Sequence, residues 1–241
     1  MISILPVRGL PEVEADHDLA ATIAQAAALE DGDVVVVAHK IVSKAEGRVV
    51  RLDGVEPSER AVRLAGPDRD PRELEVVLRE AVRVVRERGP LVIAETHHGF
   101  VCASAGVDHS NAPEPGSVVL LPLDPDASAR RIRDGLVSRT GRTVAVVVTD
   151  SCGRPFRHGT TDVAIGVAGL APLVDLRGTA DRAGRVLSST QVAVVDEIAA
   201  AADLARGKAD GVPVVIVRGL AAAGDGTARE LVIEPERDLF R

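Results

Sequence analysis

The sequence predicts an α+β fold in which mixed and antiparallel sheets are flanked by helices. Short apolar runs typical of buried strands are separated in many places by stretches with helical apolar spacing. Several expected strands nevertheless follow one another without an intervening helix, as within residues 91–121, and this disfavours a purely doubly wound sheet. The chain has 241 residues, 46% of them hydrophobic, which suffices for a sizeable core. We therefore expect one domain over residues 1–241, with a charged tail from about residue 224.

The first half of the chain alternates strand and helix signals. Apolar or alternating runs predict strands at residues 2–6, 34–38, 91–95, 99–103 and 118–121, with another short strand after Arg48. Apolar spacing predicts a helix capped by Asp16 or Asp18, and further helices at residues 57–65 and 71–88. A loop at residues 105–113 is expected to hold Asp108 and Asn111 between strands.

The second half is organised around one apolar run at residues 144–148. This run predicts a strand buried on both faces, because continuous β-branched residues leave no polar face for water. A helix at residues 126–139 is expected before it, and a polar loop from Thr149 to Asp162 after it. The rest is expected to comprise an apolar segment at 163–170, a charged loop at 175–184, a helix at 188–205, a turn at 207–211 and a strand at 214–217.

Composition and charge exclude several classes of function. The formal net charge of −7 argues against a general binder of polyanions. Only three residues are aromatic, all phenylalanine, which disfavours a nucleic-acid reader built on stacking. The sequence has no signal-peptide pattern and no apolar run of membrane-spanning length. Cys102 and Cys152 stand in no metal-ligand spacing and fit a reducing compartment. We expect a cytoplasmic protein that binds neither nucleic acid nor membrane.

The polar stretch after the buried run carries the first candidate site. Residues 144–162, VAVVVTDSCGRPFRHGTTD, place Asp150 and Ser151 at the strand's end, close to Arg154, Arg157 and His158. Carboxylate and hydroxyl oxygens suit a hard divalent cation, and arginines suit phosphate and other anionic substrate groups. A strand that ends in a polar turn without function is an equally good interpretation of this stretch alone.

Further candidates are dispersed along the chain. Asp108 adds a carboxylate, and Lys40 and Lys44 follow a buried strand at a position suited to contact phosphate, although lysines are commonplace there. Neither the P-loop pattern nor the Gly-rich dinucleotide turn occurs. The dispersed set suits a metal-assisted transfer of a nucleotide phosphoryl group.

Five long segments follow one another in a fixed order: LPVRGLPE, DGDVVVVAHKIVSKAEGRVV from Asp31, ETHHGFVCASAGVDHSNAP from Glu95, VVVTDSCGRPFRHGTTDVAIGVAGL from Val146 and PVVIVRG from Pro213. Together they resemble the coenzyme F420-0:L-glutamate ligase family. The resemblance covers nearly the whole chain. It implies a GTP-dependent ligase that adds L-glutamate to coenzyme F420-0 through an acyl phosphate and releases GDP and phosphate.

The resemblance also implies site residues, cofactors and an assembly. The nucleotide contacts would be Leu10, Pro11, Glu12, Val13, His39, Lys44 and Asn111. Two Mg²⁺ or Mn²⁺ ions would be held by Asp108, Asp150 and Ser151, and K⁺ is a further candidate cofactor. The family fold implies an intertwined homodimer of two-lobed chains. No catalytic side chain is assigned, and Arg154, Arg157 and His158 are candidates for substrate binding on charge alone.

Two departures from the family pattern bear on these expectations. Lys208 stands where archaeal relatives have a metal-contacting Gln. Many actinobacterial relatives carry a fused flavin-reductase-like domain after this region. For this chain both arrangements stay open: a stand-alone ligase, or a ligase accompanied by such a domain, fused or separate. Two alternatives stay open: an amide ligase for another phosphorylated acid, and a nucleotide-binding partner module without catalysis. The sequence does not fix the number of glutamates added or which metal is used.

Overall fold

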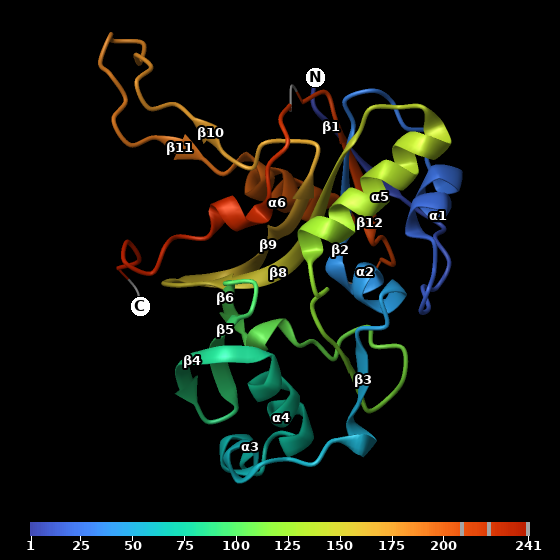
Figure 1. Ribbon diagram of the computed structural model, residues 1–241, viewed down its shortest axis with the longest axis vertical. Coiled ribbons are helices and arrows are strands. Elements are labelled where there is room, and N and C mark those ends of the chain that lie inside the picture. Colours follow the sequence, from blue (N-terminus) through green and yellow to red (C-terminus); the bar gives the residue numbers. More distant parts are fainter. Residues whose placement is uncertain (208–209, 221–222, 240–241) are drawn as a thin grey trace.

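A five-stranded sheet forms the centre of the computed structural model, which describes residues 1–207, 210–220 and 223–239 (Figure 1). Its strands lie in the order β1 (Ser3–Val7), β12 (Val214–Arg218), β2 (Val34–Ala38), β8 (Ala145–Arg154) and β9 (Arg157–Ala168). Only β2 and β8 pair in parallel, and the other neighbours are antiparallel. The expected α+β class with mixed and antiparallel sheets is therefore confirmed.

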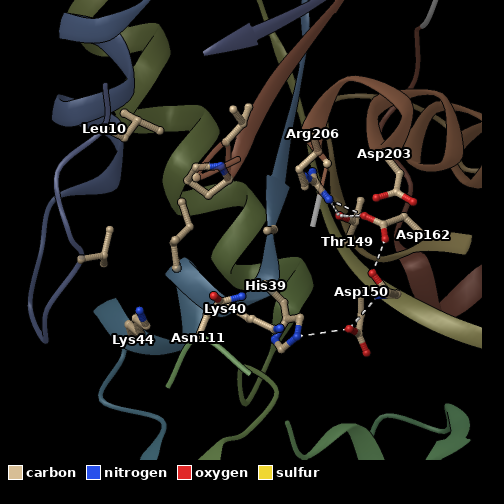
Figure 2. Close-up of a pocket in the computed structure, with 18 of the residues that line it drawn as sticks. Leu10, His39, Lys40, Lys44, Asn111, Thr149, Asp150, Asp162, Asp203 and Arg206 are labelled. Carbon is tan, nitrogen blue, oxygen red and sulfur yellow. Dashed lines mark hydrogen bonds and ion pairs between the residues drawn. The ribbon is translucent and has the colours of Figure 1, made fainter. Parts of the chain in front are cut away.

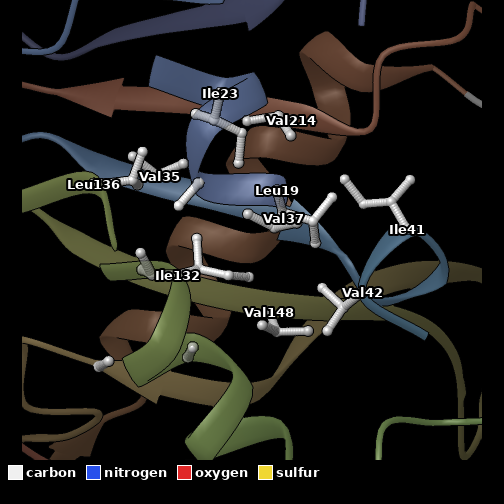
Figure 3. Packing of buried hydrophobic residues seen from close by; sticks show 14 of the residues in the cluster. Leu19, Ile23, Val35, Val37, Ile41, Val42, Ile132, Leu136, Val148 and Val214 are labelled. Carbon is white, nitrogen blue, oxygen red and sulfur yellow. The ribbon is translucent and has the colours of Figure 1, made fainter. Parts of the chain in front are cut away.

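Helices cover both faces of this sheet. On one face, α1 (Leu19–Ala26) and α5 (Pro125–Thr140) pack against side chains such as Val35, Val37 and Val148 (Figure 3). On the other face, α6 (Val194–Arg206) packs against Val34, Val36 and Val147. Since alternate residues of a strand point to opposite faces, both sets must be apolar. This explains the unbroken valine runs of β2 and β8.

A smaller part of the chain lies below the main sheet in Figure 1. It contains the antiparallel strands β4 (Ala81–Arg88), β5 (Leu91–Thr96) and β6 (Val101–Ala103) with helices α3 (Glu59–Ala65) and α4 (Pro71–Glu80). The pair β3 (Val49–Arg51) and β7 (Ser117–Val119) joins it to α2 (His39–Ala45). Short 3₁₀ turns occupy Leu52–Gly54 and Ser104–Gly106. This part has its own core, which includes Leu74, Val92 and Val118.

The C-terminal third adds an arm and a short turn. The strands β10 (Val174–Asp175) and β11 (Gln191–Val192) form the base of an arm that projects from the main sheet (Figure 1). Residues after 224 include a 3₁₀ turn, Ala228–Leu231, with a capping box between Thr227 and Glu230. No helix within the described residues is long and apolar enough to cross a membrane.

Three predicted elements were wrong in type or extent. The helix expected over residues 71–88 ends at Glu80, and the next eight residues form β4, because Val84 and its neighbours pair with β5 instead of continuing the helix. The helix expected from residue 188 begins at Val194. The polar loop expected after Val148 is a long hairpin, in which β8 continues to Arg154 and β9 returns from Arg157.

Candidate functional site

A cavity of about 330 Å³ lies where the parallel strands β2 and β8 end (Figure 2). Ala38 and Thr149 are partners in the strand register, so the residues that follow them come to the same edge of the sheet. The start of α2, the loop at residues 10–13, the end of α6 and residues 211–213 add to the described wall, together with Asn111 and Asp162. The cavity therefore joins segments from nearly the whole length of the chain.

The lysines at this edge are both paired with carboxylates. The Lys44 ammonium is buried, with 7% of the residue exposed, and it donates to Glu12 from the N-terminal loop. Lys40 lies 2.7 Å from Asp108 Oδ2. Burial acts to raise the pKa of Asp108, but hydrogen bonds from Lys40 and from the Ser110 amide outweigh it and hold that pKa below its usual range. Asp108 is thus ionised at neutral pH.

Asp150 lies beside a buried histidine. His39 is 2% exposed, and its Nε2 is 3.2 Å from Asp150 Oδ1. The distance allows an ion pair, but the angles are not those of a hydrogen bond, so Nε2 has no hydrogen-bond partner among the described residues. The Ser151 amide donates to Asp150 Oδ1 at 2.7 Å. The described residues offer Oδ2 no hydrogen bond, which leaves it available to a ligand.

A second polar network extends from Ser151 into the protein. Asp162 is 2% exposed and accepts hydrogen bonds from Ser151 Oγ at 2.5 Å and Thr149 Oγ1 at 3.0 Å. Arg206, the last residue of α6, donates from Nη1 to Asp162 Oδ2 and to Thr149 Oγ1. Burial lowers the pKa of Arg206, and the charges of Asp162 and Asp203 oppose that shift. The guanidinium stays protonated at neutral pH.

The guanidinium of Arg206 is only partly satisfied. The residue is 8% exposed, yet its Nε and Nη2 atoms are buried without a hydrogen-bond partner among the described residues. A buried donor without a partner costs roughly 1–3 kcal/mol. Such groups are rare in folded proteins and call for a structural or functional explanation.

The donor set fits a hard divalent cation at Asp150. Carboxylate oxygens are the ligands that Mg²⁺ and Mn²⁺ prefer, and Mg²⁺ is commonly held by one or two carboxylates together with substrate phosphates. Asp150 offers a free oxygen, whereas both oxygens of Asp108 are engaged, by Ser110 and Lys40. Among the described residues, no three His, Cys, Asp or Glu side chains gather in one group that could hold a metal ion. Substrate oxygens and water would therefore complete the coordination.

The cavity gathers most, but not all, of the predicted site residues. Its wall includes Leu10, Pro11, Glu12, Val13, His39, Lys44, Asn111, Asp150 and Ser151. Asp108 is not part of the wall and reaches it through Lys40. Arg154, Arg157 and His158 are exposed on the distal part of the β8–β9 hairpin and do not line the cavity. Lys208 lies outside the described residues.

Sequence reasoning missed the residues on the α6 side of the cavity. Thr149, Asp162, Asp203 and Arg206 all line it. In the sequence, Asp162 is only the end of a polar stretch, and Arg206 stands just after the helix predicted at 188–205, with nothing nearby that indicates a buried partner. Asp162 and Arg206 are 44 residues apart, so only the folded chain brings them together.

A second cavity of about 320 Å³ shares Asp150 with the first. Its wall is mainly apolar and includes Phe100, Leu121, Val163, Ile165 and Val232, with Asp196 as a further carboxyl group. Burial raises the pKa of Asp196, although a hydrogen bond from the Ala164 amide opposes the shift. Burial also raises the pKa of Cys102 to about 12, so this thiol is protonated and unreactive at neutral pH.

Known proteins match this chain closely. Residues 9–219 match the model of a family described as F420-0:Gamma-glutamyl ligase. A protein of Methanopyrus kandleri named Coenzyme F420:L-glutamate ligase is 48% identical over 100% of this chain and 98% of its own length. Proteins of the same name from Methanothermobacter thermautotrophicus and Archaeoglobus fulgidus are 45% and 43% identical, over 100% of this chain and 99% and 96% of their own lengths.

Proposed function

The chain belongs to the F420-0:gamma-glutamyl ligase family, and we propose that it is a GTP-dependent ligase that joins L-glutamate to coenzyme F420-0 in the biosynthesis of coenzyme F420. The observation that carries the proposal is the composition of the first cavity. All seven residues that the family resemblance assigns to the nucleotide line it, together with Asp150 and Ser151. These residues come from separate segments, and a shared role in binding one ligand accounts for their convergence.

The charge balance of the cavity supports a requirement for metal. Its described wall holds four carboxylates, Glu12, Asp150, Asp162 and Asp203, against three permanent cations, Lys40, Lys44 and Arg206. The wall alone is therefore unable to neutralise a triphosphate. We propose that two ions, Mg²⁺ or Mn²⁺, held by Asp108, Asp150 and Ser151, would supply this charge when GTP is bound. Asp108 would have to leave Lys40 to serve as a ligand. K⁺ is a further candidate cofactor.

The proposed reaction has two steps. A carboxylate oxygen of F420-0 attacks the γ-phosphorus of GTP, the bond to the β-phosphate oxygen breaks, and GDP leaves. The amine of L-glutamate then attacks the carbonyl carbon of the acyl phosphate, an amide forms with loss of a proton, and inorganic phosphate leaves. Lys44 would hold a phosphate oxygen, since its ammonium is already fixed at the cavity wall by Glu12. Catalysis in such transfers is chiefly positioning and charge neutralisation.

We assign F420-0 to the second cavity. That cavity meets the first at Asp150, so an acceptor in it could present its carboxylate to a nucleotide in the other. Its wall is mainly apolar, which suits a flat ring in a protein with so few aromatic side chains. Arg154, Arg157 and His158 remain candidates for the anionic groups of a substrate that extends along the hairpin.

We also propose that the protein is an intertwined homodimer and that a flavin-reductase-like domain, fused or separate, cooperates with it. Light scattering of the purified protein in solution tests the dimer, which has twice the mass of one chain. A monomer mass at working concentration would contradict it.

Isotope transfer tests the acyl phosphate. F420-0 labelled with ¹⁸O in its reactive carboxylate is incubated with GTP, L-glutamate and Mg²⁺ or Mn²⁺. One ¹⁸O atom should appear in the released phosphate, with one GDP formed for each amide. Phosphate without ¹⁸O, despite amide formation, would exclude the acyl phosphate. GDP release without glutamylation would favour a ligase for another acid, and nucleotide binding without GDP release would favour the partner module.

A further inference from the structure

The orientation of the Arg206 guanidinium leaves its best binding edge unused. A guanidinium can hold a carboxylate or phosphate with two parallel N–H groups, and Nε with Nη2 forms one such edge. Arg206 instead meets Asp162 and Thr149 with Nη1 alone. Nε and Nη2 are buried and have no hydrogen-bond partner among the described residues.

Other arginines of the same chain show what a purely structural ion pair looks like here. Arg72, Arg177 and Arg218 each hold a carboxylate with both Nε and Nη2. In these pairs the two-pronged edge faces the protein partner. Arg206 differs, because its protein partners accept hydrogen bonds from Nη1, and the edge formed by Nε and Nη2 has no protein partner among the described residues. A contact that only neutralised Asp162 would not require this edge to stay without a partner.

Arg206 belongs to the wall of the first cavity, and its unused edge lies buried just behind that wall. Arg206 lines that cavity at the end of α6, and Figure 2 shows it on the opposite side from Lys44. Asp162 and Thr149 are themselves buried, so they fix the guanidinium firmly. Solvent does not reach Nε or Nη2, and a ligand must therefore displace the wall that covers them.

We propose that the Nε–Nη2 edge of Arg206 binds two oxygens of an anionic substrate group, with Asp162 and Thr149 as positioning residues. This inference rests on the proposed function, since it assigns the residue to a substrate of that reaction. The ligand chemistry is a phosphate or a carboxylate. A phosphate would come from the nucleotide, and a carboxylate would come from L-glutamate or F420-0.

The test compares Arg206→Lys with Arg83→Lys. Lysine at position 206 keeps a positive charge beside Asp162 but has no pair of parallel N–H groups. Arg83→Lys is the control, because Arg83 is an exposed partner of Glu95 outside the cavity. Calorimetry measures the binding of GTP, GDP, guanosine, L-glutamate and F420-0 to each metal-loaded protein. We expect Arg206→Lys to weaken binding of the anion that uses the edge by roughly tenfold or more, and Arg83→Lys to change nothing.

The pattern of affinity losses among the five ligands identifies which substrate supplies the anion. Weaker GTP binding, with guanosine unchanged, assigns the edge to phosphate: to the γ-phosphate if GDP binding is unchanged, and to the α- or β-phosphate if GDP binding weakens too. Weaker L-glutamate or F420-0 binding assigns the edge to a carboxylate. Wild-type affinities of Arg206→Lys for all five probes would overturn the proposal. Binding needs no turnover, so a wild-type protein that binds these anions through Arg206 but fails to glutamylate F420-0 would disprove the function alone.

A second measurement covers the case in which Arg206→Lys does not fold. The buried Nε–H of Arg206 in the wild-type protein should exchange slowly and give a ¹⁵N signal apart from those of exposed arginines. Addition of GTP, L-glutamate or F420-0 should shift that signal. If none of the three moves it, the edge binds no substrate.

Discussion

Removal of Asp162 should leave a buried positive charge without its partner. The Asp162 side chain is 2% exposed and that of Arg206 is 10% exposed, so solvent screens their interaction little. Asp162→Ala also removes the acceptor for Ser151 and Thr149. Breaking a buried ion pair from one side costs about 3–5 kcal/mol. We expect a loss of this size in the free energy of unfolding, measured by urea denaturation.

A double variant separates the charge effect from the loss of packing. Replacing a complete buried pair by apolar side chains is often neutral or stabilising. Asp162→Ala with Arg206→Met should therefore be more stable than Asp162→Ala alone, and the coupling free energy in the cycle should exceed about 1 kcal/mol. Additive effects, or a loss below about 1 kcal/mol for Asp162→Ala, would refute the view that this pair is buried and tightly coupled.

Three further changes test other parts of the site. Asp196→Asn should stabilise the protein at pH 7, because burial raises the folded pKa of Asp196 and its ionised form disfavours folding. The gain in stability should fade as the pH falls through that pKa, and thermal melts at several pH values measure it. An equal gain at all pH values would contradict this. Lys44→Met should weaken GTP binding by about tenfold or more in calorimetry while the fold persists, since Lys44 offers its charge at the cavity wall; unchanged affinity would remove Lys44 from the nucleotide site. Val101→Trp, at a residue 42% exposed in the second cavity, should raise KM for F420-0 and leave KM for GTP unchanged; the opposite pattern would move F420-0 elsewhere.

The sequence predicts β2 and β8 of the central sheet well, because burial on both faces leaves a local signature. The valine runs of β2 and β8 are unbroken, and their ends bring His39 and Asp150 to one edge. The helix over residues 71–88 was overextended because Ala81 and Val85 keep a helical spacing past Glu80. Pairing with β5 decides the conformation there, and pairing between distant segments leaves no trace in a local window.

The candidate site likewise contains residues that the sequence predicts and residues that only the structure reveals. Lys44 and Asp150 are candidates already because each follows a buried strand, and the family resemblance adds Asn111; the structure brings all three to one cavity. Arg206 was overlooked because a charged residue at a helix end usually faces solvent. Its burial depends on Asp162, which β9 brings beside β8 through the hairpin that was expected to be a loop. Residues whose roles depend on such long-range pairs are identified only from the folded structure.

Mass spectrometry of the reaction products tests the proposed activity most directly. Purified protein is incubated with F420-0, L-glutamate, GTP and Mg²⁺ or Mn²⁺, with ATP in place of GTP and a metal chelator as controls. We predict a product heavier by one or more glutamyl units, one GDP for each unit added, and no product without metal or with ATP. A folded, metal-loaded protein that leaves F420-0 unchanged under these conditions would contradict the account.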